Sequence, residues 1–153
     1  MSHNLKTSFC RMMIGSVALA ALWGMISIIV PYRREYRIEQ RLATIYCDVE
    51  REYHGPKFLP AWISDETRIF HRIEMVGSNE PSDLPREYCL ELRKLPYLRR
   101  IHANPTGLTD ADLEIFKDLK NLEYLWLDNT QTTSEGRDRL RKALPNCEIT
   151  PAP

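Results

Sequence analysis

The sequence predicts an α/β fold in which about three strand–helix repeats follow a single membrane-spanning helix. Three observations predict it: a long uncharged segment near the N-terminus, a 24-residue period in the C-terminal half, and strand-like alternation followed by helical spacing within each period. Together they divide the chain into a tail (1–11), a transmembrane helix (12–30), a juxtamembrane helix and capping segment (31–69), and the repeats (70–153).

The segment from Met12 to Val30 contains no charged residue. A helix of about that length, with a rise of 1.5 Å per residue, crosses a hydrocarbon core of roughly 30 Å. A cleaved signal peptide would need a shorter apolar region that ends in small residues, and the best candidate, Ala18-Leu19-Ala20, lies in the middle of the segment. We therefore expect an uncleaved anchor, with a secreted protein released by cleavage as the alternative.

Charges on the two sides of this segment favour a cytoplasmic repeat domain by a small margin. Lys6, Arg11 and the α-amine precede the segment. Four arginines follow it, namely Arg33, Arg34, Arg37 and Arg41. Because cytoplasmic flanks carry the excess of Lys and Arg, the repeats are predicted on that side. The three cysteines of the soluble part are an odd number, which fits a reducing compartment.

A stripe of small residues gives a second hypothesis, that of a structural protein that associates with itself. Ser16, Ala20 and Gly24 recur at every fourth position within the apolar segment. Small residues at this spacing allow two membrane helices to approach closely, which makes a homodimer the alternative to binding another protein. The other interpretation, which we favour, is that Ala, Gly and Ser are simply common in membrane helices.

The repeat period is visible in pairs of residues at equivalent positions of successive units. Leu98 returns as Leu122, and Ile101 returns as Leu125. In Leu122-x-x-Leu125-x-Leu127, the last two leucines alternate along a short strand and point to one side. Each strand is followed by helical spacing, and one such unit cannot bury its apolar face alone, so the units must stack.

Hydroxyl and carboxylate side chains mark where the repeat helices begin. Thr109 or Asp110 is expected to cap a helix that starts near Ala111, and Ser134 is expected to cap one that starts near Glu135.

The two ends of the array are less regular. Phe70-x-x-Ile73-x-Met75 predicts the strand of a first repeat, which a loop over 77–85 follows. Ile73 is then equivalent to Ile101, with a small insertion between them. Before it, alternation over 45–50 predicts a strand, and Phe58, Leu59, Trp62 and Ile63 predict a short helix that covers the first apolar face. In the last unit Thr132 and Arg137 replace apolar residues, so its outer side is expected to meet water.

The spacing over 70–149 resembles the leucine-rich-repeat family, whose core pattern is LxxLxLxx(N/T)x(L/I)T. It is most similar to short bacterial membrane-anchored members that carry Thr at the loop position and end in LPNC-x-I, which here spans 144–149. In that family the strands line a concave surface that binds proteins or peptides. The resemblance implies the following outward, binding residues: Arg72, Glu74, Arg100, His102, Asn104, Tyr124, Trp126 and Asp128.

Tyr124 and Trp126 stand out in this set. Exposed aromatic residues beside arginine are typical of an interface hot spot. The alternative is that Trp126 packs over its strand neighbours and only shields the sheet. Both interpretations stay open on the sequence alone.

Other function classes are disfavoured by composition. The 21 basic and 21 acidic residues balance, so nucleic acid is not an expected partner. The cysteines have no CxxC spacing, the histidines are isolated and no glycine-rich phosphate loop occurs, so we expect no metal and no cofactor. A catalytic Cys–His pair would have to be Cys47–His54 or Cys89–His102. Both cysteines are better explained as small buried apolar residues, so we expect the protein not to be an enzyme.

Overall fold

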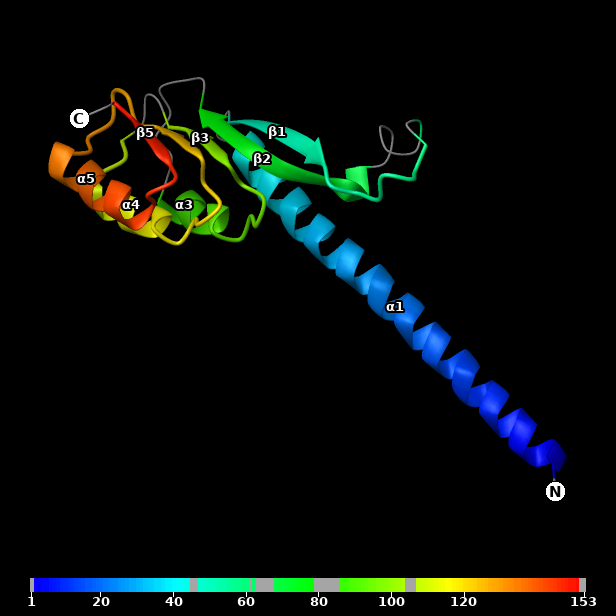
Figure 1. The fold of residues 1–153 in the computed structure, drawn as a ribbon. Coiled ribbons are helices and arrows are strands. Elements are labelled where there is room, and N and C mark those ends of the chain that lie inside the picture. The colour runs from blue at the N-terminus through cyan, green and yellow to red at the C-terminus, as the bar shows by residue number, and fades with distance from the viewer. Residues whose placement is uncertain are drawn as a thin grey trace.

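The computed structural model consists of one long helix that leads from the N-terminus into a sheet covered by shorter helices (Figure 1). It describes residues 2–44, 47–60, 62, 68–78, 86–103 and 107–151, with backbone alone for 2–15 and Ser78. In chain order the elements are α1 (Ser2–Ala43), β1 (Cys47–Tyr53), the 3-10 turn η1 (Arg68–Phe70), β2 (His71–Ser78), α3 (Arg86–Leu92), β3 (Arg100–His102), α4 (Asp110–Phe116), β4 (Tyr124–Trp126), α5 (Ser134–Ala143) and β5 (Glu148–Thr150).

The strands form one sheet in the order β1-β2-β3-β4-β5. β1 and β2 are antiparallel, whereas β2 to β5 run parallel, as strand–helix–strand connections require. The register aligns Ile101, Leu125 and Ile149, which confirms the period predicted from the sequence. Helices α3, α4 and α5 lie on one side of the sheet (Figure 1), and the other side is called the open face below.

The first repeat has a different register from the predicted one. Val76, and not Ile73, aligns with Ile101, so the first step along the chain is shorter than predicted. The pairing of β1 with β2 contains a bulge that gives β2 one extra residue, Glu74, and this lets both Ile73 and Val76 reach the core. β2 also extends through the first two residues of the predicted loop, of which 79–85 lie outside the described residues.

The core consists of rows of side chains that continue from one unit to the next. The strand row contains Val76, Ile101, Leu125 and Ile149, all of which are buried. A parallel row from the helices contains Leu92, Phe116 and Leu140, which follow the same period and are fully buried. Burying each such side chain contributes roughly 1.5–3 kcal/mol, and most of its contacts come from the neighbouring unit, so the units stabilise one another.

The C-terminal end of α1 covers the first repeat. Ile38 and Leu42 are buried in the same core as the strands, while β1 pairs with the edge of β2. The predicted covering role of Phe58 and Trp62 is wrong, because they are 84% and 68% exposed; Trp62 is helical, and Ile63 lies outside the described residues. Since α1 fills the apolar side of β2 and β1 pairs its backbone, that segment has no face left to cover.

The rest of α1 extends away from the sheet (Figure 1). From Ser16 onward the described helix is long and apolar enough to cross a membrane, although a signal sequence near the N-terminus meets the same criteria. Leu19 and Trp23 are exposed, and the helix continues through Pro31 without a break. The stripe of small residues at 16, 20 and 24 lies on this part, and the predicted homodimer stays a prediction.

Polar residues in the last unit are more buried than predicted. Thr132 is 8% exposed, and its hydroxyl lies 2.8 Å from that of Thr130. The half-buried Arg137 donates to the carbonyl oxygen of Thr132 at 2.7 Å. These hydrogen bonds offset part of the cost of burying the polar groups, although Nε of Arg137 has no hydrogen-bond partner among the described residues.

The N-terminal turns of α4 and α5 are joined by a polar contact. Thr133, not the predicted Ser134, caps α5, and its hydroxyl accepts a hydrogen bond from the Gly136 backbone N–H at 3.0 Å. Asp110 at the start of α4 accepts hydrogen bonds from the hydroxyl and the backbone N–H of Thr133 at 2.6 and 2.8 Å. These bonds lower the pKa of Asp110, so their stabilisation is present above the ordinary carboxyl pKa and is lost as the pH falls through the lower folded value.

Replacing Gly136 by alanine should lower the melting temperature of the full chain in detergent, although alanine favours a helix interior by about 1 kcal/mol over glycine. A Cβ at this position would overlap the carboxylate of Asp110 and displace it from Thr133. The control is the same substitution in an Asp110→Ala background, where alanine should be neutral or stabilising. A higher melting temperature for Gly136→Ala alone would contradict the contact.

Candidate protein-binding face

The open face carries two rows of side chains that cross the strands. They flank the inward-facing row and therefore point to the opposite side of the pleated sheet. The first row is Glu50, Met75, Arg100, Tyr124 and Glu148. The second row is Asp48, Gly77, His102, Trp126 and Thr150. The face thus extends over five strands, wider than the three strands that the sequence predicted.

Three rings form the centre of this face. The centroids of the His102 and Trp126 rings lie 3.9 Å apart, and Tyr124 stacks on Trp126 at 5.5 Å with an interplanar angle of 20°. A Cβ at Gly77 would lie 3.4 Å from that of His102, an ordinary van der Waals distance. Trp126 is half-buried and Tyr124 is 40% exposed, so Trp126 covers the sheet while the stack still presents an aromatic surface.

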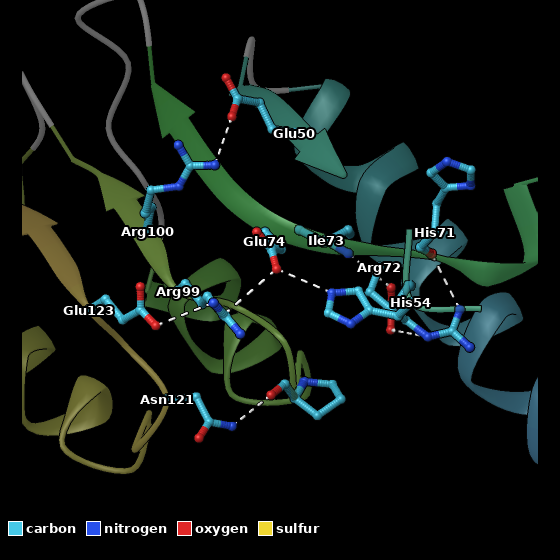
Figure 2. Close-up of polar contacts among 12 residues, drawn as sticks. Glu50, His54, His71, Arg72, Ile73, Glu74, Arg99, Arg100, Asn121 and Glu123 are labelled. Carbon is cyan, nitrogen blue, oxygen red and sulfur yellow. Dashed lines mark hydrogen bonds and ion pairs between the residues drawn. The ribbon is translucent and has the colours of Figure 1, made fainter. Parts of the chain in front are cut away.

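Figure 2 shows ion pairs between charged side chains of neighbouring strands and of the residues beside them. Nη2 of Arg100 lies 3.0 Å from Oε2 of Glu50, an ion pair that reaches across β2. Arg99 lies between two carboxylates, with Nε 3.7 Å from Glu74 and Nη1 3.4 Å from Glu123. An aromatic centre with a polar border is the usual composition of a protein-binding surface.

Most residues predicted to line the binding surface lie together on this face, namely Arg100, His102, Tyr124, Trp126 and Asp128. Asn104 lies outside the described residues. The half-buried Asp128 accepts a hydrogen bond from the hydroxyl of Thr150 at 3.1 Å. The sequence analysis missed Glu148 and Thr150, although extending the repeat period by one more unit around Ile149 would have found both.

Arg72 and Glu74 do not lie on the accessible surface, contrary to the prediction. They are 8% and 6% exposed. The guanidinium of Arg72 donates to the carbonyl oxygen of Ile69 at 2.9 Å, and its Nε lies 3.8 Å from the Glu35 carboxylate on α1. The bulge in β2 shifts both residues out of the two outward rows. Arg72 then lies beside Glu35 on α1, and Glu74 lies beside Glu52, His54 and Arg99.

Glu74 belongs to a cluster that sequence spacing did not reveal. Oxygens of Glu52 and Glu74 and a ring nitrogen of His54 all lie within 4.8 Å of one another. Nε2 of His54 is 3.1 Å from Oε1 of Glu74, and its ring lies 4.4 Å from that of Tyr97. The cluster brings together residues that are distant in sequence. The one feature of the sequence that could have indicated it is the alternate spacing of Glu52 and His54.

The electrostatics of this cluster favour a shared proton. Burial raises the pKa of Glu74, and the hydrogen bond to Glu74 lowers the pKa of Glu52. The ligand types would suit a divalent cation, but Arg99 lies beside the same oxygen of Glu74 that His54 contacts. The described groups therefore satisfy one another as an ion-pair network, and the expectation of no metal stays a prediction.

Replacing Glu74 by glutamine should leave the melting temperature unchanged or raise it at neutral pH. Because the pKa of Glu74 is raised in the fold, ionising this carboxyl reduces the stability of the fold. The stability that protonated Glu74 contributes is fully present below the ordinary carboxyl pKa and is lost as the pH rises through the folded pKa. Glutamine cannot ionise, so the stability of the Glu74→Gln variant should decline less steeply with rising pH than that of the unmodified chain. Thermal unfolding between pH 4 and 8 measures it.

The control for this prediction is Glu74→Ala, which removes the hydrogen-bond partner of His54 and one of the two carboxylates beside Arg99, and should cost about 1–3 kcal/mol. Equal destabilisation by glutamine and by alanine would show that the charge of Glu74, and not its hydrogen bonds, stabilises the fold.

No model of a protein family matches the chain, and no curated protein does. Among solved structures, the chain is similar to a leucine-rich-repeat protein of Leptospira interrogans. The two are 25% identical, with a TM-score of 0.38, over 50% of this chain. The matched part is 24% of the Leptospira chain, so this chain spans about a quarter of that protein's length.

Proposed function

We propose that this chain is a membrane-anchored leucine-rich-repeat protein whose open face binds a protein or peptide. The family assignment is supported by the LxxLxL spacing together with parallel strands whose register follows the repeat period. The observation that carries the binding role is the stack of His102, Tyr124 and Trp126 at the centre of the open face. Tyr and Trp in such a position are typical binding hot spots.

The shape and charge of the open face favour a protein or peptide ligand. The open face extends across five strands and offers contact area to a partner, and the stacked rings add apolar area on the sheet. Exposed Glu148 and the paired Arg100 at either side of Tyr124 supply hydrogen-bonding groups for orientation. These features suit one patch or one segment of a partner.

A binding role is also favoured over catalysis by the state of the described cysteines. Burial raises the pKa of Cys47 and Cys147 to about 11, and that of Cys89 to about 12. The thiolate is the reactive form of cysteine, so these side chains are poor nucleophiles near neutral pH. Their role is to fill the core as small apolar groups.

Photo-crosslinking in cells tests the binding face. A p-benzoyl-phenylalanine residue placed at Tyr124 should capture a discrete partner, because the ring at this position is exposed beside Trp126. The matched control carries the same probe at Glu114, an exposed position on α4 at the helical side of the sheet. Adding Trp126→Ala to the Tyr124 probe should reduce the crosslinked band at least tenfold, as hot-spot truncations do.

Equal crosslinking from Tyr124 and Glu114, or a band that Trp126→Ala leaves unchanged, would sink the proposal for this face. A crosslinked product with twice the mass of the chain would instead support self-association.

The membrane anchor is supported by the exposed apolar part of α1, whose side chains no other described part of the chain covers. We expect the chain to stay in the membrane pellet after alkaline carbonate extraction, and its intact mass to include residues 12–30. A mature N-terminus beyond Val30 would identify a cleaved signal sequence and contradict the anchor. Protease accessibility in intact and lysed cells then assigns the side of the repeats, with a cytoplasmic location expected.

A further inference from the structure

We infer that a basic pocket between α1 and the end of α3 binds the phosphate headgroup of an anionic phospholipid. The inference rests on the proposed membrane anchor. The pocket has a volume of about 450 Å³ and is lined by Arg34, Arg37, Ile38, Arg41, Glu91 and Lys94. It therefore lies where the helix leaves the apolar segment and meets the repeats.

The helix brings three of the cations to one side. Arg34, Arg37 and Arg41 follow one another at steps of three and four positions, which places them on one face of α1. Lys94 comes from the turn after α3, and the ion pair between Arg41 and Glu91, at 3.3 Å, connects α1 to the end of α3. The pocket is thus formed only when α1 and the first repeat dock.

The pocket has an excess of positive charge. Its one lining carboxylate, Glu91, is shared by Arg41 at 3.3 Å and Lys94 at 2.8 Å. Arg34 and Arg37 have no carboxylate partner within the part of the chain that the structure describes. Arg37 uses Nε to donate to the Arg33 carbonyl oxygen at 3.3 Å, and that bond leaves its two terminal nitrogens for a ligand.

The distance along α1 matches the headgroup layer. At 1.5 Å per residue, Arg34 and Arg37 lie about 6 and 10 Å beyond Val30, where the apolar segment ends. The headgroup region extends roughly 5–8 Å from the hydrocarbon core on each side, within reach of an arginine side chain. The rings of Tyr32 and Tyr36, 6.1 Å apart, lie at the same depth, as aromatic residues at membrane interfaces do.

An anionic headgroup fits this chemistry better than a zwitterionic one. Guanidinium groups bind phosphate oxygens through paired hydrogen bonds, and juxtamembrane basic clusters favour anionic lipids. A phosphatidylcholine headgroup offers the same phosphate, but its quaternary ammonium group would be repelled by Lys94 and Arg41 around the pocket.

Native mass spectrometry of the full chain tests the inference. The detergent-purified protein is titrated with phosphatidylglycerol, with phosphatidylcholine and with inorganic phosphate. We expect phosphatidylglycerol to bind at least tenfold more tightly than phosphatidylcholine, and inorganic phosphate not to displace it. Arg37→Gln should weaken phosphatidylglycerol binding roughly fivefold, the equivalent of one juxtamembrane cation.

Arg33→Gln is the matched control, because Arg33 is an exposed arginine of the same helix that does not line the pocket. It should change the affinity less than twofold. Equal losses from Arg33→Gln and Arg37→Gln, or equal affinity for the two lipids, would overturn the pocket while leaving the anchor intact. Displacement by phosphate would identify a soluble anion as the ligand and overturn the lipid assignment. Failure of the anchor itself is detected separately, by carbonate extraction and mature mass.

Discussion

The row of inward-facing side chains formed by Val76, Ile101, Leu125 and Ile149 is the interaction on which the rest of the structure depends. Each strand–helix unit is too small to bury its own apolar side, so each completes its core with the next unit. This constraint fixes the parallel register of β2 to β5. It also creates two ends that must be closed, and most irregular features of the chain lie at those ends.

The first end is closed by the same helix that carries the apolar segment. Glu35 on α1 is 2% exposed, and its Oε2 accepts a hydrogen bond from the backbone N–H of Ile73 at 3.2 Å. Arg51 of β1 pairs with Glu39 on α1. A buried carboxylate is tolerated only with such partners, so these contacts hold α1 in one orientation on the sheet. Under the proposed anchoring, the orientation of the repeats relative to the membrane is then set by this docking.

The two proposed binding surfaces use different elements of this arrangement. The open face is built from strands, where the aromatic stack lies on a rigid sheet bordered by ion pairs. The basic pocket is built where α1 meets α3, next to the apolar segment. Because no residue belongs to both surfaces, partner binding and lipid binding can be disturbed separately.

Much of the fold could be predicted because it depends on local patterns. The repeat period, the strand over β1 and the helix after the apolar segment all follow from the spacing of residues along the chain. The family resemblance implied that Arg100, His102, Tyr124 and Trp126 point outward, and the register of β3 and β4 gives them that orientation, while their binding role stays a prediction.

Other features depend on contacts between distant segments, which a pattern along the chain does not contain. The bulge at Glu74 arises from pairing with β1, and it buries Arg72 and Glu74 despite their outward pattern. The Glu52–His54–Glu74 cluster and the pocket between α1 and α3 likewise exist only after docking. The sequence by itself thus determined the repeating units and the apolar helix, because periodicity is local. The tertiary structure alone decided which charged groups are buried, paired or left open, because that depends on what packs against them.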